Sequence, residues 1–111
     1  MQTVFHVSTP EDVRVVVAKV RNLLADESVE MESVAAVFDR GEAIASLHAD
    51  SDLAGDLRDL LGEGAGLKVC RNAARHPAVS ETDLLEGVEV VSSGVGELTR
   101  LQDEGYAYVR L

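Results

Sequence analysis

The chain has 111 residues, of which 46% are hydrophobic, and twenty acidic residues face ten basic ones to give a formal net charge of −10. This length predicts a single domain over residues 1–111, and the apolar fraction excludes a disordered chain. No lysine- or arginine-rich block offsets the negative charge, which argues against direct binding of nucleic acid or of an anionic membrane.

The first elements in chain order are a strand and an amphipathic helix. Residues 2–7 are rich in β-formers and predict a strand. The segment "STPED" follows, in which Ser8 or Thr9 can cap a helix and Pro10 suits its first turn. From Pro10 to about Glu27, apolar residues recur every three or four positions, which predicts one buried stripe.

The middle of the chain predicts a second strand and two further helices. "VAAVF", residues 34–38, is continuously apolar, as in a strand buried on both faces of a parallel sheet. Asp39 stands three residues before Glu42, which predicts a cap for a short helix through Leu47. Leucines over residues 53–61 predict another helix, which the glycines of "GEGAG" end.

The carboxyl-terminal half repeats the alternation. Residues 67–70 predict the third strand, and Ser80, with Asp83 three residues later, predicts a short capped turn before a fourth strand over 88–91. The segment "SSGVGELTRLQDEG" predicts a helix that stops at Gly105, and "YAYVRL" predicts the last strand.

This alternation predicts an α/β fold with three α/β/α layers around a largely parallel, five-stranded sheet. In such sheets ligands bind outside the carboxyl ends of the strands. The predicted ends lie at residues 6–9, 39–41, 70–72 and 92–96. Cys70, the only cysteine, therefore falls at the edge where function is expected.

One cysteine cannot form an internal disulfide, and the amino terminus shows no export signal. No apolar stretch approaches the roughly 20 residues that span a bilayer. We therefore expect a soluble cytoplasmic protein whose thiol stays reduced. The acidic, lysine-poor composition also resembles that of halophilic proteins, although an ordinary soluble acidic protein is the simpler alternative.

The segment "CRNAARH" could activate the thiol of Cys70. Arg71, Arg75 and His76 are close in sequence, and a helical turn over residues 72–75 would add N–H donors. The alternative is that Cys70 is a small apolar filler, a common role for free cysteine. The "SSGVG" turn, with Ser93 and Gly94, could bind an anion, or its glycines could simply permit a tight turn.

The remaining polar residues give weaker signals. Three histidines and Cys70 match no zinc spacing, so no metal site is expected. His6 could approach Cys70 if their strands are neighbours, with a structural histidine as the alternative. The acidic residues are spread over helix faces and are expected to be solvated surface charges.

Three segments together resemble the DsrE/DsrF-like family, in particular its small, single-domain YchN-like members. These are "VFHVS" in the first strand, "VCRN" at the end of the third, and "GVEVVSSGVGELTRLQDEGYAYVRL" at the carboxyl terminus. Cys70 falls on the cysteine of the family's C-x-N element and Asn72 on its asparagine. "VFDRG" and "NAARH" depart from the family pattern at the edge of the presumed site.

The resemblance implies an α/β/α protein that assembles as a trimer or hexamer and relays sulfur between donor and acceptor proteins as a persulfide on Cys70, without a cofactor. Arg71 and the N–H groups of residues 71–73 would stabilise the sulfur anion. Ser93, Gly94 and His6 would complete the surroundings. The alternative function is a non-catalytic oligomeric module that binds a small anion or a partner protein at the strand ends.

Overall fold

A computed structural model describes all residues 1–111 and contains one five-stranded parallel sheet, in the order β4-β3-β2-β1-β5. The strands are β1 Gln2–Val7, β2 Ser33–Phe38, β3 Gly66–Cys70, β4 Glu89–Val91 and β5 Ala107–Val109. The helices are α1 Pro10–Ala25, α2 Gly41–Ile44, α3 Ala54–Gly62 and α4 Gly94–Asp103, with short 3-10 turns η1 Ala45–Leu47, η2 Ala73–Arg75 and η3 Glu81–Asp83. The predicted parallel α/β fold is confirmed.

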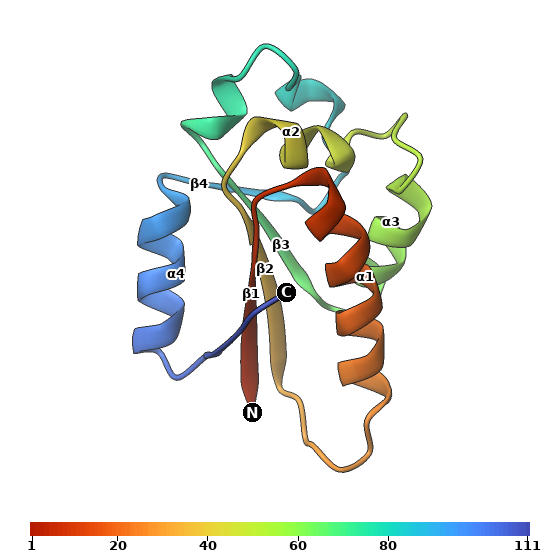
Figure 1. The fold of residues 1–111 in the computed structure, drawn as a ribbon, viewed down its shortest axis with the longest axis vertical. Coiled ribbons are helices and arrows are strands. Elements are labelled where there is room, and N and C mark those ends of the chain that lie inside the picture. Colours follow the sequence, from red (N-terminus) through yellow and green to blue (C-terminus); the bar gives the residue numbers. More distant parts are fainter.

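The strand order explains the three layers. Each strand from β1 to β4 lies beside the one before it, always on the same side. Right-handed crossovers between them therefore place α1, α2 and α3 on one face. The connection from β4 to β5 runs back past β1, so its helix, α4, covers the opposite face. Figure 1 shows α4 alone on one side of the sheet and α1 and α3 on the other.

The two faces bury unequal cores. Nineteen buried residues form the cluster between the sheet and α1, α2 and α3. The cluster beneath α4 has only five: Val4, Ala35, Val37, Leu98 and Leu101. The α4 face therefore has room for polar side chains.

The start of α1 follows the sequence prediction. Thr9 caps the helix, its side chain accepting a hydrogen bond from the Asp12 N–H, and the Asp12 carboxylate accepts from the N–H groups of Ser8 and Thr9. The pKa of Asp12 is lowered chiefly by the hydrogen bond that its carboxylate accepts from the Ser8 N–H. Because Thr9 is the cap, the hydroxyl of Ser8 is free for another role.

Several local predictions are wrong. Asp39 does not cap the helix that follows it: Arg40 occupies that position and makes no side-chain capping bond. Ser80 does occupy the capping position of its turn, but its hydroxyl pairs with Thr82 and makes no capping bond. The fourth and fifth strands are shorter than predicted, at three residues each. None of the helices combines the length and apolar character that crossing a membrane requires.

Candidate functional site at the carboxyl ends of the strands

The strand register brings three polar residues side by side. Val7 pairs with Phe38, and Phe38 pairs with Val69. The residues that follow these three are Ser8, Asp39 and Cys70. Cys70 therefore lies beside Asp39 at the end of the central strand, and Asp39 lies beside Ser8.

Asp39 and Cys70 share the face of the sheet that α4 covers. Side chains alternate along a strand, and Val37, two residues before Asp39, packs beneath α4. Lys68, two residues before Cys70, also reaches α4. A Cβ atom added at Gly94 would lie 3.0 Å from the Asp39 Cβ and 3.3 Å from the Cys70 Cβ. The amino-terminal end of α4 thus rests directly on both side chains.

Cys70 is a free, partly exposed thiol beside a helix amino terminus. The hydroxyl of Ser93 caps α4 by accepting a hydrogen bond of 3.0 Å from the Gly96 N–H. The N–H groups of Gly94 and Val95 lie in the first turn, where donors have no partner within the helix. Free N–H donors at a helix amino terminus can hydrogen-bond to a bound anion.

Arg71 and Asn72 lie on the surface directly after the cysteine. The Arg71 N–H donates a hydrogen bond of 2.8 Å to the Val91 carbonyl, so it continues the β3–β4 ladder. The expectation that this N–H stabilises the sulfur anion is therefore wrong. The exposed guanidinium of Arg71 makes no ion pair within the chain, and Asn72 leads into η2.

A hydrogen-bonded cluster lies next to Cys70, at the ends of β1 and β2. It consists of His6, Ser8 and Asp39. The Nε2 atom of His6 lies 2.6 Å from Asp39 Oδ2 and 3.1 Å from Ser8 Oγ, and Ser8 Oγ donates to Asp39 Oδ1 at 2.9 Å. One ring nitrogen contacts both oxygens, whereas a serine protease relay uses one nitrogen for each. The cluster therefore fixes the Asp39 carboxylate and does not activate Ser8.

His6 and Cys70 are not direct neighbours, because β2 separates their strands. Asp39 occupies the place between them, so His6 reaches the cysteine's surroundings only through this carboxylate. Sequence reasoning treated Asp39 as a helix cap and missed this role. The signal available in the sequence was that Asp39 directly follows the buried strand, at the same edge as Cys70.

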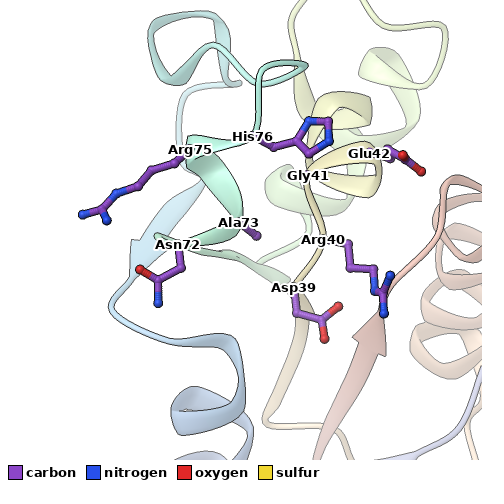
Figure 2. Close-up of a pocket in the computed structure, with 8 residues that line it drawn as sticks. All are labelled: Asp39, Arg40, Gly41, Glu42, Asn72, Ala73, Arg75 and His76. Atoms are coloured by element: carbon purple, nitrogen blue, oxygen red, sulfur yellow. The ribbon is translucent and has the colours of Figure 1, made fainter.

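An open depression of about 590 Å³ lies between α2 and η2, at the ends of β2 and β3. Figure 2 shows the eight residues that line it: Asp39, Arg40, Gly41, Glu42, Asn72, Ala73, Arg75 and His76. Cys70 is not among them. Asp39 and Asn72 connect the depression with the cysteine, since one flanks Cys70 across the sheet and the other follows it in the chain.

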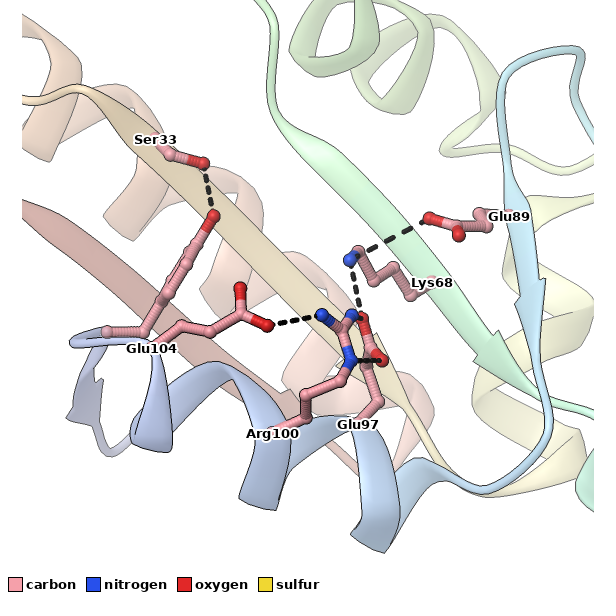
Figure 3. Close-up of polar contacts among 7 residues, drawn as sticks. Ser33, Lys68, Glu89, Glu97, Arg100 and Glu104 are labelled. Atoms are coloured by element: carbon pink, nitrogen blue, oxygen red, sulfur yellow. Dashed lines mark hydrogen bonds and ion pairs between the residues drawn. The ribbon is translucent and has the colours of Figure 1, made fainter.

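A buried ion network holds α4 against the sheet. Glu97 is only 6% exposed and accepts hydrogen bonds from Lys68 of β3 and from Arg100 (Figure 3). Burial alone would raise the pKa of Glu97, but the hydrogen bonds and positive charges of Arg100 and Lys68 outweigh it and lower the pKa. The expectation that all acidic residues are solvated is wrong for Glu97. Its position one turn after Gly94 means that the network also places the amino end of α4 over Cys70.

The other histidines have local structural contacts. His48 accepts a hydrogen bond of 3.0 Å from the Ser80 N–H, and His76 accepts one of 3.0 Å from the Ala78 N–H. Nowhere do three or more histidine, cysteine or carboxylate side chains converge in an arrangement that could hold a metal ion.

Comparisons with known proteins agree with this architecture. Residues 20–111 match the model of the DsrE/DsrF-like family. The solved structure of MTH1491, a protein of unknown function from Methanobacterium thermoautotrophicum, is similar over 99% of this chain and 98% of that chain, with 38% sequence identity and a TM-score of 0.87. A search of curated proteins finds none that matches. The family match over most of the chain shows that this protein belongs to the DsrE/DsrF-like family.

Proposed function

We propose that the protein is a sulfur carrier that holds sulfane sulfur as a persulfide on Cys70. The observation that carries the proposal is the placement of its one cysteine, partly exposed and lying against the amino-terminal turn of α4. Membership of the DsrE/DsrF-like family is consistent with a sulfur-relay role. A reducing cytoplasm would keep Cys70 as the free thiol that a carrier needs.

The reaction is an exchange that needs no cofactor. The Cys70 thiolate attacks the outer sulfur of a donor R–S–SH, a new S–S bond forms, and the donor's S–S bond breaks. The electron pair leaves on R–S⁻, while the proton stays on the transferred sulfur to give Cys70–S–SH. An acceptor thiolate then attacks that outer sulfur and releases Cys70 as the thiolate. No net oxidation or reduction occurs.

Each neighbour of Cys70 has a distinct role in this proposal. The α4 terminus, capped by Ser93 and seated through Gly94, stabilises the thiolate and the persulfide anion. The guanidinium of Arg71 supplies an exposed positive charge, and Asn72 offers an amide at the mouth of the site. His6 acts at a distance, through its hydrogen bond to the carboxylate of Asp39.

Mass spectrometry of the intact protein tests the proposal. The reduced protein is incubated with inorganic polysulfide, and its mass is compared with that of Cys70→Ser. The expected result is a gain of one sulfur atom on the native chain that dithiothreitol removes and that Cys70→Ser never shows. A native protein that gains no sulfur under these conditions contradicts a carrier role.

A non-catalytic binding module is the second candidate, because Cys70 does not line the depression of about 590 Å³. In that case a ligand would bind there with equal affinity to the native protein and to Cys70→Ser, and neither would take up sulfur.

Assembly into a homo-oligomer, a trimer or a hexamer, belongs to both candidates. Val95, Tyr108 and Val109 are large apolar side chains that this single chain leaves exposed, and β5 is an open edge strand. Sedimentation at equilibrium checks this expectation, and a monomer at both low and high salt would contradict it.

A further inference from the structure

The His6–Asp39 pair lies on the same face and at the same edge of the sheet as Cys70. Val4, two residues before His6, packs beneath α4, so side-chain alternation places His6 on the face that Asp39 and Cys70 share. Their strands, β1, β2 and β3, are consecutive neighbours, and adjacent strands in a sheet lie about 4.8 Å apart. Asp39 is therefore the residue between the imidazole of His6 and the thiol of Cys70.

Asp39 is close enough to Cys70 for its charge to act on the thiol. The Cβ atoms of both residues lie within 3.3 Å of one point, the place that a Cβ atom added at Gly94 would take. The Asp39 side chain is only 21% exposed, so water screens its charge incompletely. A carboxylate at this spacing opposes a second negative charge on the sulfur, and a positive partner of the carboxylate removes that opposition.

The hydrogen bonds of the cluster determine which nitrogen of His6 can gain a proton. The hydroxyl of Ser8 donates to Asp39 Oδ1, and a carboxylate has no hydrogen to give, so Nε2 of His6 donates to Asp39 Oδ2. Nδ1 is then the free nitrogen, and no hydrogen bond engages it. A proton on Nδ1 makes the His6–Asp39 pair neutral overall, whereas without that proton the pair has one negative charge.

His6 is the group near the cluster whose charge ordinarily changes between about pH 5 and 8. The other charged side chains around it are carboxylates, guanidinium groups and one ammonium group, which ordinarily keep their charge in this range. They are Asp12 of α1, Glu97 and Arg100 of α4, Lys68 and Glu89 in the sheet, and Arg40, Arg71 and Arg110 close after β2, β3 and β5.

We propose that His6 is a positioning residue for Cys70, and that the charge of the His6–Asp39 pair sets how readily this cysteine forms its thiolate. Protonated His6 neutralises the Asp39 carboxylate, so the S–H bond of Cys70 ionises more easily. One proton leaves the sulfur and one is held on Nδ1, so that the net charge of the site is unchanged. The consequence for sulfur transfer rests on the proposed function, whereas the coupling itself does not.

The rate of alkylation by iodoacetamide tests the coupling, because this neutral reagent reacts with the thiolate of the only cysteine. His6→Gln keeps an amide group that can hydrogen-bond to Asp39 but cannot take up a proton. We expect the native protein to react about threefold faster than His6→Gln at pH 5.5. Its thiolate is about tenfold more abundant there, but a thiol that ionises more readily is a weaker nucleophile. At pH 8.5, where histidine is ordinarily neutral, the two rates should agree within about 1.3-fold.

His48→Gln is the matched control. It also removes a partly buried imidazole, but that ring contacts the Ser80 N–H and lies outside the cluster. Its alkylation rate should equal that of the native protein at both pH values. A loss of equal size in His6→Gln at pH 5.5 and 8.5, a rate that does not change at either, or the same loss in His48→Gln would overturn the inference.

Asp39→Asn tests the same coupling without altering His6. The thiolate absorbs near 240 nm, and the matching chain with Cys70→Ser serves as the blank. Without the carboxylate, the thiolate titration should move to lower pH by about one unit. An unchanged titration, or one displaced to higher pH, would overturn the inference even if His6→Gln failed to fold.

Two outcomes distinguish this inference from the carrier role. A pH-dependent difference between the native protein and His6→Gln, in a protein that takes up no sulfur from polysulfide, would support the coupling and contradict the carrier. Uptake of sulfur on Cys70 without that difference would support the carrier and overturn the coupling.

Discussion

Replacing Gly94 by alanine should shift α4 slightly away from the strand ends, because the new methyl group would crowd two side chains. Its Cβ would lie 3.0 Å from that of Asp39 and 3.3 Å from that of Cys70, both closer than ordinary van der Waals contact. Overpacking of this kind costs about 1–3 kcal/mol, against a gain in helix propensity of up to about 1 kcal/mol. With a gain of about 0.5 kcal/mol in a first turn, the expected net loss in unfolding free energy is about 0.5–2.5 kcal/mol.

Gly55→Ala is the matched control for this change. Gly55 also lies in the first turn of a helix, α3, and nothing comes within 4 Å of an added Cβ. We expect this variant to gain about 0.5 kcal/mol. Urea unfolding measures both free energies, and the alkylation rate of Cys70 by iodoacetamide reports the change at the thiol. If Gly94→Ala were stabilised as much as Gly55→Ala, the close seating of α4 on Cys70 would be refuted.

Four further predictions concern the Glu97 network, its pH dependence, the Thr9 cap and the effect of salt. Glu97→Gln should lower the unfolding free energy by about 2 kcal/mol in urea titrations, whereas Glu104→Gln, in an exposed pair, should change it by about 0.5 kcal/mol or less; similar losses would contradict the buried network. Since the pKa of Glu97 is lowered in the fold, its contribution is fully present above the ordinary carboxyl value of 4.5 and disappears as the pH falls through the lowered pKa. Acid titrations of native protein and Glu97→Gln should therefore converge below that window, and a constant difference would argue against it. Thr9→Ala should lower the free energy of unfolding by about 1 kcal/mol, because the Asp12 N–H loses its capping partner. An unchanged urea midpoint would contradict the capping box. If the acidic composition is halophilic, the melting temperature should rise between about 0.1 and 2 M KCl as the self-repulsion is screened, and a fall would contradict this.

The fold was largely predictable because its determinants are local. Apolar periodicity, the Thr9 cap and the stop at Gly105 all act within a few residues, and the structure has a helix or strand in each predicted place. The lengths of β4 and β5 were not predictable. Both are edge strands, paired on one side only, so their extent depends on the neighbour and less on their own residues.

The site was only partly predictable, because its contacts cross the chain. The local spacing of Asp39 and Glu42 fits a helix cap, yet the carboxylate binds His6, 33 residues away. Choosing between these partners requires the strand order, which no local pattern gives. The burial of Glu97 was not predictable for the same reason, because its compensating charge comes from Lys68 on a different element. The place of Cys70 at the strand ends followed from topology alone.

Transfer of labelled sulfur tests the central claim most directly. Native protein loaded with ³⁵S from polysulfide and freed of excess reagent should hold one label per chain on Cys70. It should transfer that labelled sulfur to an added thiol, which becomes a persulfide, and should then accept a second sulfur atom from polysulfide. A label that enters Cys70→Ser equally well, or that never leaves the native protein for a thiol acceptor, would contradict the assignment of this cysteine as a sulfur carrier.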